Sequence, residues 1–347
     1  MRALHKFVAA AFASSLTFFM ALGNAIAAPF SFIAFGDVPY SNAEVHILRY
    51  MIEQINALPV KFVIHVGDFK SGQSLCNDTT FAARHADFSA SKHPFIYLTG
   101  DNEWVDCHRP EAGGFVPVER LAALRKLFFA TDQTLGQQPR RVERQAGFPE
   151  NVWWAQSGDG SAEQSVAFIG LNVQGSNNNW LTVTQRIPLR ATGTDGNEEF
   201  RAREKANLRW LTRAVDEAIN ARRAALVVAF QANPDFEERL LAERKPREGA
   251  GLRFATDQHD GFASLRAALA KEAKRFGKPI LVIHGDTHQL KDDTPLRDAN
   301  GNIVQNVRRL EVHGSPFLGW TEVMVDTNKP GVFQVEGKRY ARKATGP

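Results

Sequence analysis

The chain has 347 residues, of which 44% are hydrophobic and 23% are charged, and its formal net charge is +4. This length accommodates one large domain or two modest ones with a full hydrophobic core. The composition excludes a largely disordered chain. The near balance of 42 basic and 38 acidic residues gives no indication of a nucleic-acid partner.

The first 27 residues have the pattern of a secretory signal peptide. Arg2 and Lys6 stand at the start of an apolar run, and Ala25-Ile26-Ala27 forms a small-x-small cleavage pattern. We expect cleavage after Ala27, a secreted or periplasmic protein, and no stable membrane anchor afterwards. Cleavage would leave 40 basic against 38 acidic residues, a net charge of +2. The alternative is an uncleaved membrane helix, for which the run is near the short limit.

Residues 28–347 are predicted to form a single domain in which strands and helices alternate. Strands are expected at 30–37, 61–69, 93–104, 152–156, 165–174, 225–234, 279–286, 307–313, 319–325 and 331–335. Helices are expected at 43–58, 79–90, 116–130, 198–221 and 262–276. A hairpin turns at Asn300-Gly301. The polar stretches 175–200 and 237–258 are interpreted as surface loops. Alternation followed by late β-rich segments predicts a layered α/β domain.

The only two cysteines are Cys76 and Cys107, and each follows a predicted strand by a few residues. In an exported protein such a pair favours a disulfide, which would lie at one edge of the sheet. Free thiols are the alternative, and a metal site built from both cysteines is disfavoured.

Four aspartates, Asp37, Asp68, Asp101 and Asp286, each follow a glycine at the end of an apolar strand. Ligands of α/β sheets gather at the carboxyl ends of strands. Four carboxylates placed together raise one another's pKa unless a cation compensates their charge. Any single Gly-Asp pair is explained by a simple turn, but four in register, with His288 beside the last, predict a shared metal site.

The order of these motifs resembles the calcineurin-like metallophosphoesterase superfamily. The resemblance rests on GD at 36–37, GDF at 67–69, GDNE at 100–103, QANP at 231–234 and GDTH at 285–288, and it covers about 30–326. HGSPFLGWTEVMVD at 313–326 is similar to the closing strands of that family. The resemblance implies a four-layer α/β/β/α sandwich of the metallophosphoesterase type, with two metals bridged by an aspartate and a hydroxide.

Carried over residue by residue, the resemblance assigns Asp37 to the first metal and Asp68 to the bridge. Asp101 takes the position of the family's ligand asparagine, and Asn102 that of the histidine that acts on the leaving group. Asp286 and His288 take the positions of its last two histidines, with Asp286 standing where the family has imidazole.

Further departures leave other candidates open. Pro39 replaces the first motif's histidine, so the neighbouring Tyr40 is a candidate oxygen ligand. No histidine ends the fourth strand, and Gln231 or Asn233 is the nearest donor. His284 is either a support of the metal site or a histidine packed in the core. His108 is either a substitute general acid or a surface histidine.

Together with the signal peptide, the resemblance implies an exported phosphoesterase that hydrolyses a small phosphorylated substrate with metal-activated water. The cofactor is one or two divalent ions from Mn, Mg, Ca, Fe and Zn, and the oxygen-rich ligand set favours Mg, Mn or Ca. The alternative is a degenerate relative that binds a metal or a phosphorylated ligand without turnover. A phosphatase with a nucleophilic aspartate is disfavoured, because Asp37-Val38-Pro39 lacks the second aspartate that such enzymes carry.

Overall fold

The computed structural model describes residues 27–158, 162–181, 197–236 and 259–340. The predicted signal peptide up to residue 26, positions 182–196 of the first predicted loop and the whole of the second lie outside the described residues. None of the described helices is long and apolar enough to cross a membrane.

The first sheet has five strands in the order β12-β11-β1-β2-β3. Its parallel strands are β1 (Phe30–Phe35), β2 (Val63–His65) and β3 (Phe95–Tyr97). Antiparallel to them lies β11 (Gly319–Val325), followed at the edge by β12 (Phe333–Arg339). Because the three parallel strands run the same way, their carboxyl ends meet at one edge of this sheet.

The second sheet has seven strands in the order β4-β5-β6-β7-β8-β10-β9. Four of them are parallel, namely β6 (Val166–Gly170), β7 (Ala225–Ala229), β8 (Ile280–His284) and β10 (Val307–Glu311). Next to β6 lies the antiparallel β5 (Phe148–Gln156), and the edge strands β4 (Glu143–Gln145) and β9 (Lys291–Asp293) are antiparallel to β5 and β10.

The longer helices are α1 (Asn42–Ile55), α2 (Asp78–Ser89), α3 (Pro117–Phe128), α6 (Glu198–Asn220) and α7 (Ala263–Phe276). Shorter ones are α4 (Gly175–Asn178), η1 (Val105–His108), η2 (Pro110–Ala112) and η3 (Ala162–Gln164). Ser41 caps α1, because its side chain accepts a hydrogen bond from the Glu44 amide.

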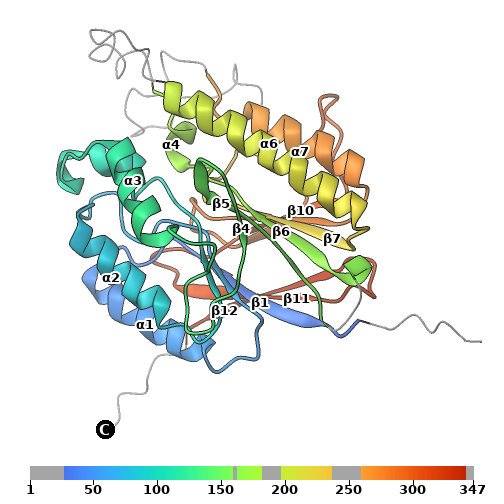
Figure 1. Ribbon diagram of the computed structural model, residues 1–347, viewed down its shortest axis with the longest axis horizontal. Helices are drawn as coiled ribbons and strands as arrows, with labels where there is room; N and C mark the ends of the chain where they lie inside the picture. Colours follow the sequence, from blue (N-terminus) through green and yellow to red (C-terminus); the bar gives the residue numbers. More distant parts are fainter. Residues whose placement is uncertain (1–26, 159–161, 182–196, 237–258, 341–347) are drawn as a thin grey trace, which may run out of the picture.

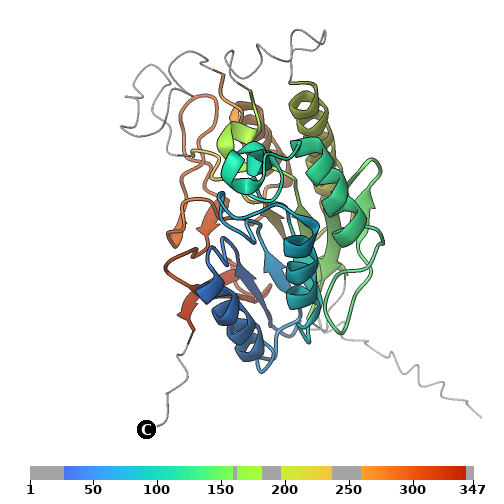
Figure 2. The ribbon, with the colours of Figure 1, turned by 90° about the vertical axis from the view of Figure 1, so that its left-hand side faces the viewer.

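Alternation along β1 shows how the layers form. Phe32 and Ala34 face a core shared by the two sheets, whereas Ile33 and Phe35 face a second core against α1, α2 and α3. A third core lies between the other sheet and helices α6 and α7. The two views show the helices as outer layers on either side of the sheets (Figures 1 and 2). The predicted α/β/β/α sandwich is therefore confirmed.

Some local predictions differ from the structure. The Asn300-Gly301 turn forms, but its flanks share only the isolated bridge between Arg297 and Ile303 rather than two strands. The strand predicted at 93–104 stops at Tyr97, because the chain turns there and then forms η1. The first predicted loop contains the short α4, which local hydrophobic periodicity does not indicate.

Candidate functional site

Strand ends from both sheets meet around Asp37. This aspartate follows β1 in the first sheet, and its two carboxylate oxygens each lie 3.2 Å from the amide nitrogen of Asp286, which follows β8 in the second sheet. The Nε2 atom of His288 lies 3.7 Å from the same carboxylate. Residues 249 positions apart in sequence therefore meet where the two sheets face each other.

Asp68, at the end of β2, is the most densely hydrogen-bonded of the four aspartates. Its Oδ2 accepts from the Tyr40 hydroxyl at 3.0 Å, the Asn102 amide at 2.8 Å and the Gln231 amide at 3.2 Å. Its Oδ1 accepts from the backbone amide of Asn102 at 3.1 Å. The structure thus brings Asp68, Tyr40, Asn102 and Gln231 together, as the motif order predicts.

The electrostatics of the cluster are dominated by uncompensated negative charge. Burial raises the pKa of Asp37 well above its ordinary value, and the charge of Asp286 raises it further. Burial, followed by the charge of Asp101, likewise raises the pKa of Asp68 well above its ordinary value and that of Asp286 to about 7. Such mutual repulsion is relieved by a bound cation.

A buried cation beside the cluster is Lys70, which is only 2% exposed. Its Nζ donates to the carbonyl oxygens of Asn102 at 2.5 Å and Ser71 at 2.9 Å. Burial lowers the pKa of Lys70, although Glu103 and Asp68 oppose that shift. One ammonium group does not balance four carboxylates, so the cluster remains suited to an added positive charge.

The backbone at the cluster is unusual. Asp37, Asp68, Asp286 and His288 all have positive φ, between 51° and 81°, a conformation that costs free energy for non-glycine residues. Such strain is concentrated at functional sites in proteins. Glycine is required beside them, because a Cβ on Gly285 would lie 2.2 Å from an oxygen of Asp37.

His65 supports two of the aspartate loops, a role that the sequence motifs do not indicate. It is fully buried, its Nδ1 accepts from the Gly67 amide at 3.1 Å, and its Nε2 lies 3.3 Å from the Val38 carbonyl oxygen. Burial lowers the pKa of His65 to about 3. The neutral ring therefore joins the loop of Asp37 to the loop of Asp68.

Glu103 joins the loop of Asp68 to the loop of Asp101. Its Oε1 accepts from the backbone amides of Asp68 at 3.1 Å and Gly100 at 2.6 Å, and from the Tyr97 hydroxyl at 2.8 Å. Burial raises the pKa of Glu103, while these hydrogen bonds partly offset the shift. The GDNE motif contained this residue, but only the fold reveals which donors it gathers.

The predicted disulfide between Cys76 and Cys107 is confirmed. Both sulfur atoms lie beside the carbonyl oxygen of Asn102, at 3.5 and 3.7 Å. That oxygen also accepts the hydrogen bond from Lys70. The disulfide therefore fixes the segment that carries Asn102 against the loop that carries Lys70.

The placements of His284 and His108 bear on their expected roles. His284 packs against Phe230 and Phe236 under the outer helices, and its Nδ1 lies 2.9 Å from the Gly285 carbonyl. As placed, His284 supports the turn that carries Asp286. His108 is exposed, with its Nδ1 2.7 Å from the Val105 carbonyl, so its catalytic role stays a prediction.

Tyr40, the candidate oxygen ligand, is a hydrogen-bond donor in this structure. Burial, together with the charge of Asp68, raises its pKa well above the ordinary value, so the hydroxyl stays protonated and donates to Asp68. As placed, Tyr40 orients that carboxylate as a neutral donor.

The donor chemistry fits a divalent cation, because carboxylates, one imidazole and an excess of negative charge converge there, and a Cβ on Gly100 or Gly285 would collide with the carboxylate of Asp68 or Asp37. In the described part of the chain, however, no group of three or more His, Cys, Asp or Glu side chains is arranged so that it could hold a metal ion. The carboxylates are instead turned toward protein donors. The predicted ligand set therefore remains a prediction.

The chain matches no family model and no curated protein. Among solved structures it is similar to a dimetal phosphatase from Danio rerio, with 12% identity and a TM-score of 0.45, over 90% of this chain and 99% of that one. It is also similar to a purple acid phosphatase from yellow lupin (Lupinus luteus) seeds, with 12% identity and a TM-score of 0.44. That second match covers 89% of this chain and 53% of the lupin chain, about half its length. Similarity at this level does not assign an activity to this chain.

Proposed function

We propose that this protein is a metal-dependent phosphoesterase that hydrolyses a small phosphorylated substrate. One observation carries the proposal: carboxylates that follow parallel strands of both sheets meet with too little positive charge beside them, Asp37, Asp68 and Asp101 being buried and Asp286 half-buried. The carboxylate cluster supports cation binding, and the resemblance of the sequence motifs to metallophosphoesterases supports phosphate-ester hydrolysis as the reaction.

Asp37, Asp68, Asp101, Asp286 and His288 are the residues that would hold one or two divalent ions. A bound divalent ion supplies Lewis acidity for the phosphate and a water of lowered pKa as nucleophile. The protein's own part begins with Asp68, whose orientation is held by three side-chain donors.

Two further side chains have defined parts. The amide of Asn102, 7% exposed, donates to Asp68 and to the Tyr40 hydroxyl, and it can offer a hydrogen bond to a substrate oxygen only by exchanging one of these partners. The guanidinium of Arg109 pairs with the carboxylate of Asp106 at 2.5 Å, and the Arg109 side chain is 34% exposed. Arg109 therefore supplies a cationic contact for phosphate at the border of the cluster.

The second candidate function is binding of a metal or a phosphorylated ligand without turnover. The observation that favours it is Asn102, which stands where the related enzymes have a histidine and cannot give up a proton to a leaving group. General acid help commonly contributes ~10²–10⁴-fold to rate. The two functions differ in turnover and not in metal binding.

The test is metal analysis of the purified mature protein together with hydrolysis of p-nitrophenyl phosphate and bis(p-nitrophenyl) phosphate under added Mn, Mg, Ca and Zn. We expect at least one metal to raise hydrolysis well above that of Asp68→Asn, after circular dichroism shows that this variant is folded. Metal binding with no hydrolysis above the variant would leave only the binding function. Neither binding nor hydrolysis would reject both.

We also propose export, with cleavage after Ala27. A disulfide is compatible with an oxidising compartment. N-terminal sequencing of protein recovered from the expressing cells should begin at Ala28, and an intact Met1 in membrane-bound protein would instead support the uncleaved helix.

A further inference from the structure

The loop after β6 contains a run of left-handed residues. Ser176, Asn177, Asn178 and Asn179 have φ of 51°, 55°, 55° and 59°. This conformation costs free energy for every residue other than glycine, and asparagine is among the few types that tolerate it. Four such residues in succession persist only if the surrounding structure imposes the turn.

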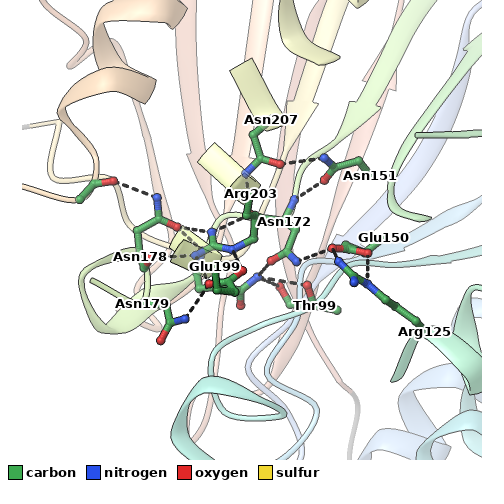
Figure 3. A network of polar contacts seen from close by, with 12 residues as sticks. Thr99, Arg125, Glu150, Asn151, Asn172, Asn178, Asn179, Glu199, Arg203 and Asn207 are labelled. Atoms are coloured by element: carbon green, nitrogen blue, oxygen red, sulfur yellow. Dashed lines mark hydrogen bonds and ion pairs between the residues drawn. The ribbon is translucent and has the colours of Figure 1, made fainter. Parts of the chain in front are cut away.

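Arg203 of α6 supplies much of that constraint. It is fully buried, and its guanidinium donates to the side-chain oxygen of Asn178 at 2.5 Å and to the Asn178 carbonyl at 2.8 Å. The same guanidinium donates to the Asn172 carbonyl at 3.1 Å. Figure 3 shows this network, in which Arg203 lies between Asn172 and Asn178.

Gly261 holds the turn from another side. Its amide donates to the side chain of Asn177 at 2.9 Å, and its carbonyl accepts from the side chain of Asn178 at 2.8 Å. Two successive residues of the left-handed turn, Asn177 and Asn178, are therefore hydrogen-bonded to Gly261, which is more than 80 positions away in the sequence.

The fastened turn presents two groups to the carboxylate cluster. The Ser176 hydroxyl donates to Oδ2 of Asp101 at 2.7 Å. The Gly175 amide donates to Oε1 of Gln231 at 2.8 Å. The carboxylate of Asp101 also packs closely against Gly175: a Cβ atom on Gly175 would lie only 2.7 Å from Oδ2 of Asp101.

We infer that the left-handed turn at 175–179 is a positioning element for the metal centre, in which Ser176 orients Asp101 and Gly175 orients Gln231. The inference rests on the proposed function and names residues that the motifs did not.

One consequence concerns Gln231. With its oxygen committed to Gly175, its amide nitrogen faces Asp68 at 3.2 Å. Gln231 is then a hydrogen-bond donor that holds Asp68, in contrast to the oxygen ligand that the sequence predicts.

Ser176 also connects Asp101 with Asp106, since its Oγ lies 3.2 Å from Oδ1 of Asp106. The hydroxyl has one proton, and the shorter distance gives it to Asp101. The other oxygen of Asp106 pairs with Arg109 at 2.5 Å. One hydroxyl thus stands between a predicted ligand and the partner of the proposed phosphate-binding arginine.

Ser176→Gly tests the inference, because glycine keeps the left-handed backbone and removes only the hydroxyl. Asn179→Gly is the matched control, since it relaxes the same turn at a residue whose side chain bonds Glu199 and not the cluster. The measurement is Mn²⁺ affinity by calorimetry, together with the melting temperature of the metal-free protein.

We expect Ser176→Gly to bind Mn²⁺ about 10- to 100-fold more weakly than wild type, as is typical when a hydrogen-bond partner of a metal ligand is lost. Asn179→Gly should bind within about threefold of wild type. Both melting temperatures should stay within about 4 °C of wild type. If the turn had a purely structural role, Ser176→Gly would change the melting temperature, and the two variants would bind Mn²⁺ with equal affinity.

Equal Mn²⁺ affinity in wild type and Ser176→Gly would overturn the inference and leave the proposed function intact. No Mn²⁺ binding by wild type would reject the metal centre and the inference with it. Gly175→Ala is a second variant that keeps the hydroxyl but pushes Asp101 away from the turn, and it too should weaken Mn²⁺ binding.

Discussion

Removing the Cys76–Cys107 disulfide should destabilise the protein by a predictable amount. The bridge joins residues 31 positions apart. The chain-entropy relation for a loop of that length gives about 12 cal/mol/K, or about 3.7 kcal/mol at 25 °C. A double variant, Cys76→Ser with Cys107→Ser, should therefore lose about 3–4 kcal/mol of unfolding free energy.

The effect should extend to the candidate site. Both sulfur atoms lie beside the Asn102 carbonyl oxygen, which accepts from Lys70. Without the bridge, the loop of Lys70 and the segment of Asn102 are joined by hydrogen bonds alone, namely that bond, those of Asp68 with Asn102 and Glu103, and the backbone bond from the Cys76 amide to the Ala112 carbonyl. We expect Mn²⁺ affinity to fall together with stability.

Urea unfolding followed by circular dichroism measures the first effect. Reduction of wild type with a phosphine should reproduce the loss, and the same reductant should not change the double variant. A double variant that unfolds within about 1 kcal/mol of oxidised wild type would refute the assigned contribution of the disulfide.

Two other predictions address the supporting residues. Glu103→Leu leaves three buried donors without an acceptor, at about 1–3 kcal/mol each, so the unfolding free energy of this variant should fall by about 3 kcal/mol or more. Glu103→Gln keeps the acceptor oxygen and should lose much less. Equal losses of the two variants in urea titrations would contradict the hydrogen-bond account. His65 has its pKa lowered to about 3 in the fold, so its neutral form contributes stability that is present above the unfolded pKa near 6.5 and is lost as pH falls toward 3. Between pH 7 and pH 5 the wild type should lose about 2 kcal/mol that His65→Gln does not lose, and parallel stability curves for the two proteins would show that His65 does not titrate in this way.

The order of strands and helices was largely predictable because it is written in local periodicity. Ala225–Ala229 is a continuous apolar run and Phe30–Phe35 is apolar except for Ser31, and such runs are typical of strands buried on both faces. The Ser41 cap lies three residues from the amide that it accepts from. Features of this kind depend on residues a few positions apart, so the sequence contains them directly.

The convergence of Asp37, Asp68 and Asp286 was predictable for a related reason. Each follows a parallel strand, and parallel strands bring their carboxyl ends to one edge. The hydrogen bond between Asp37 and Asp286 joins the two sheets at this point. The motif order was enough to predict which residues meet, but not which of their atoms face each other.

What the sequence alone determined is the set of strand-end carboxylates and the cysteine pair, because residue type and distance from a strand end are local properties. Only the tertiary structure decided that Gln231 turns its nitrogen to Asp68, that His284 packs away from the cluster, and that Ser176 reaches Asp101. Those outcomes depend on contacts such as that between Gly175 and Gln231, 56 positions apart. A side chain's orientation is set by the partners that satisfy its polar atoms, and these partners become neighbours only when the two sheets pack together.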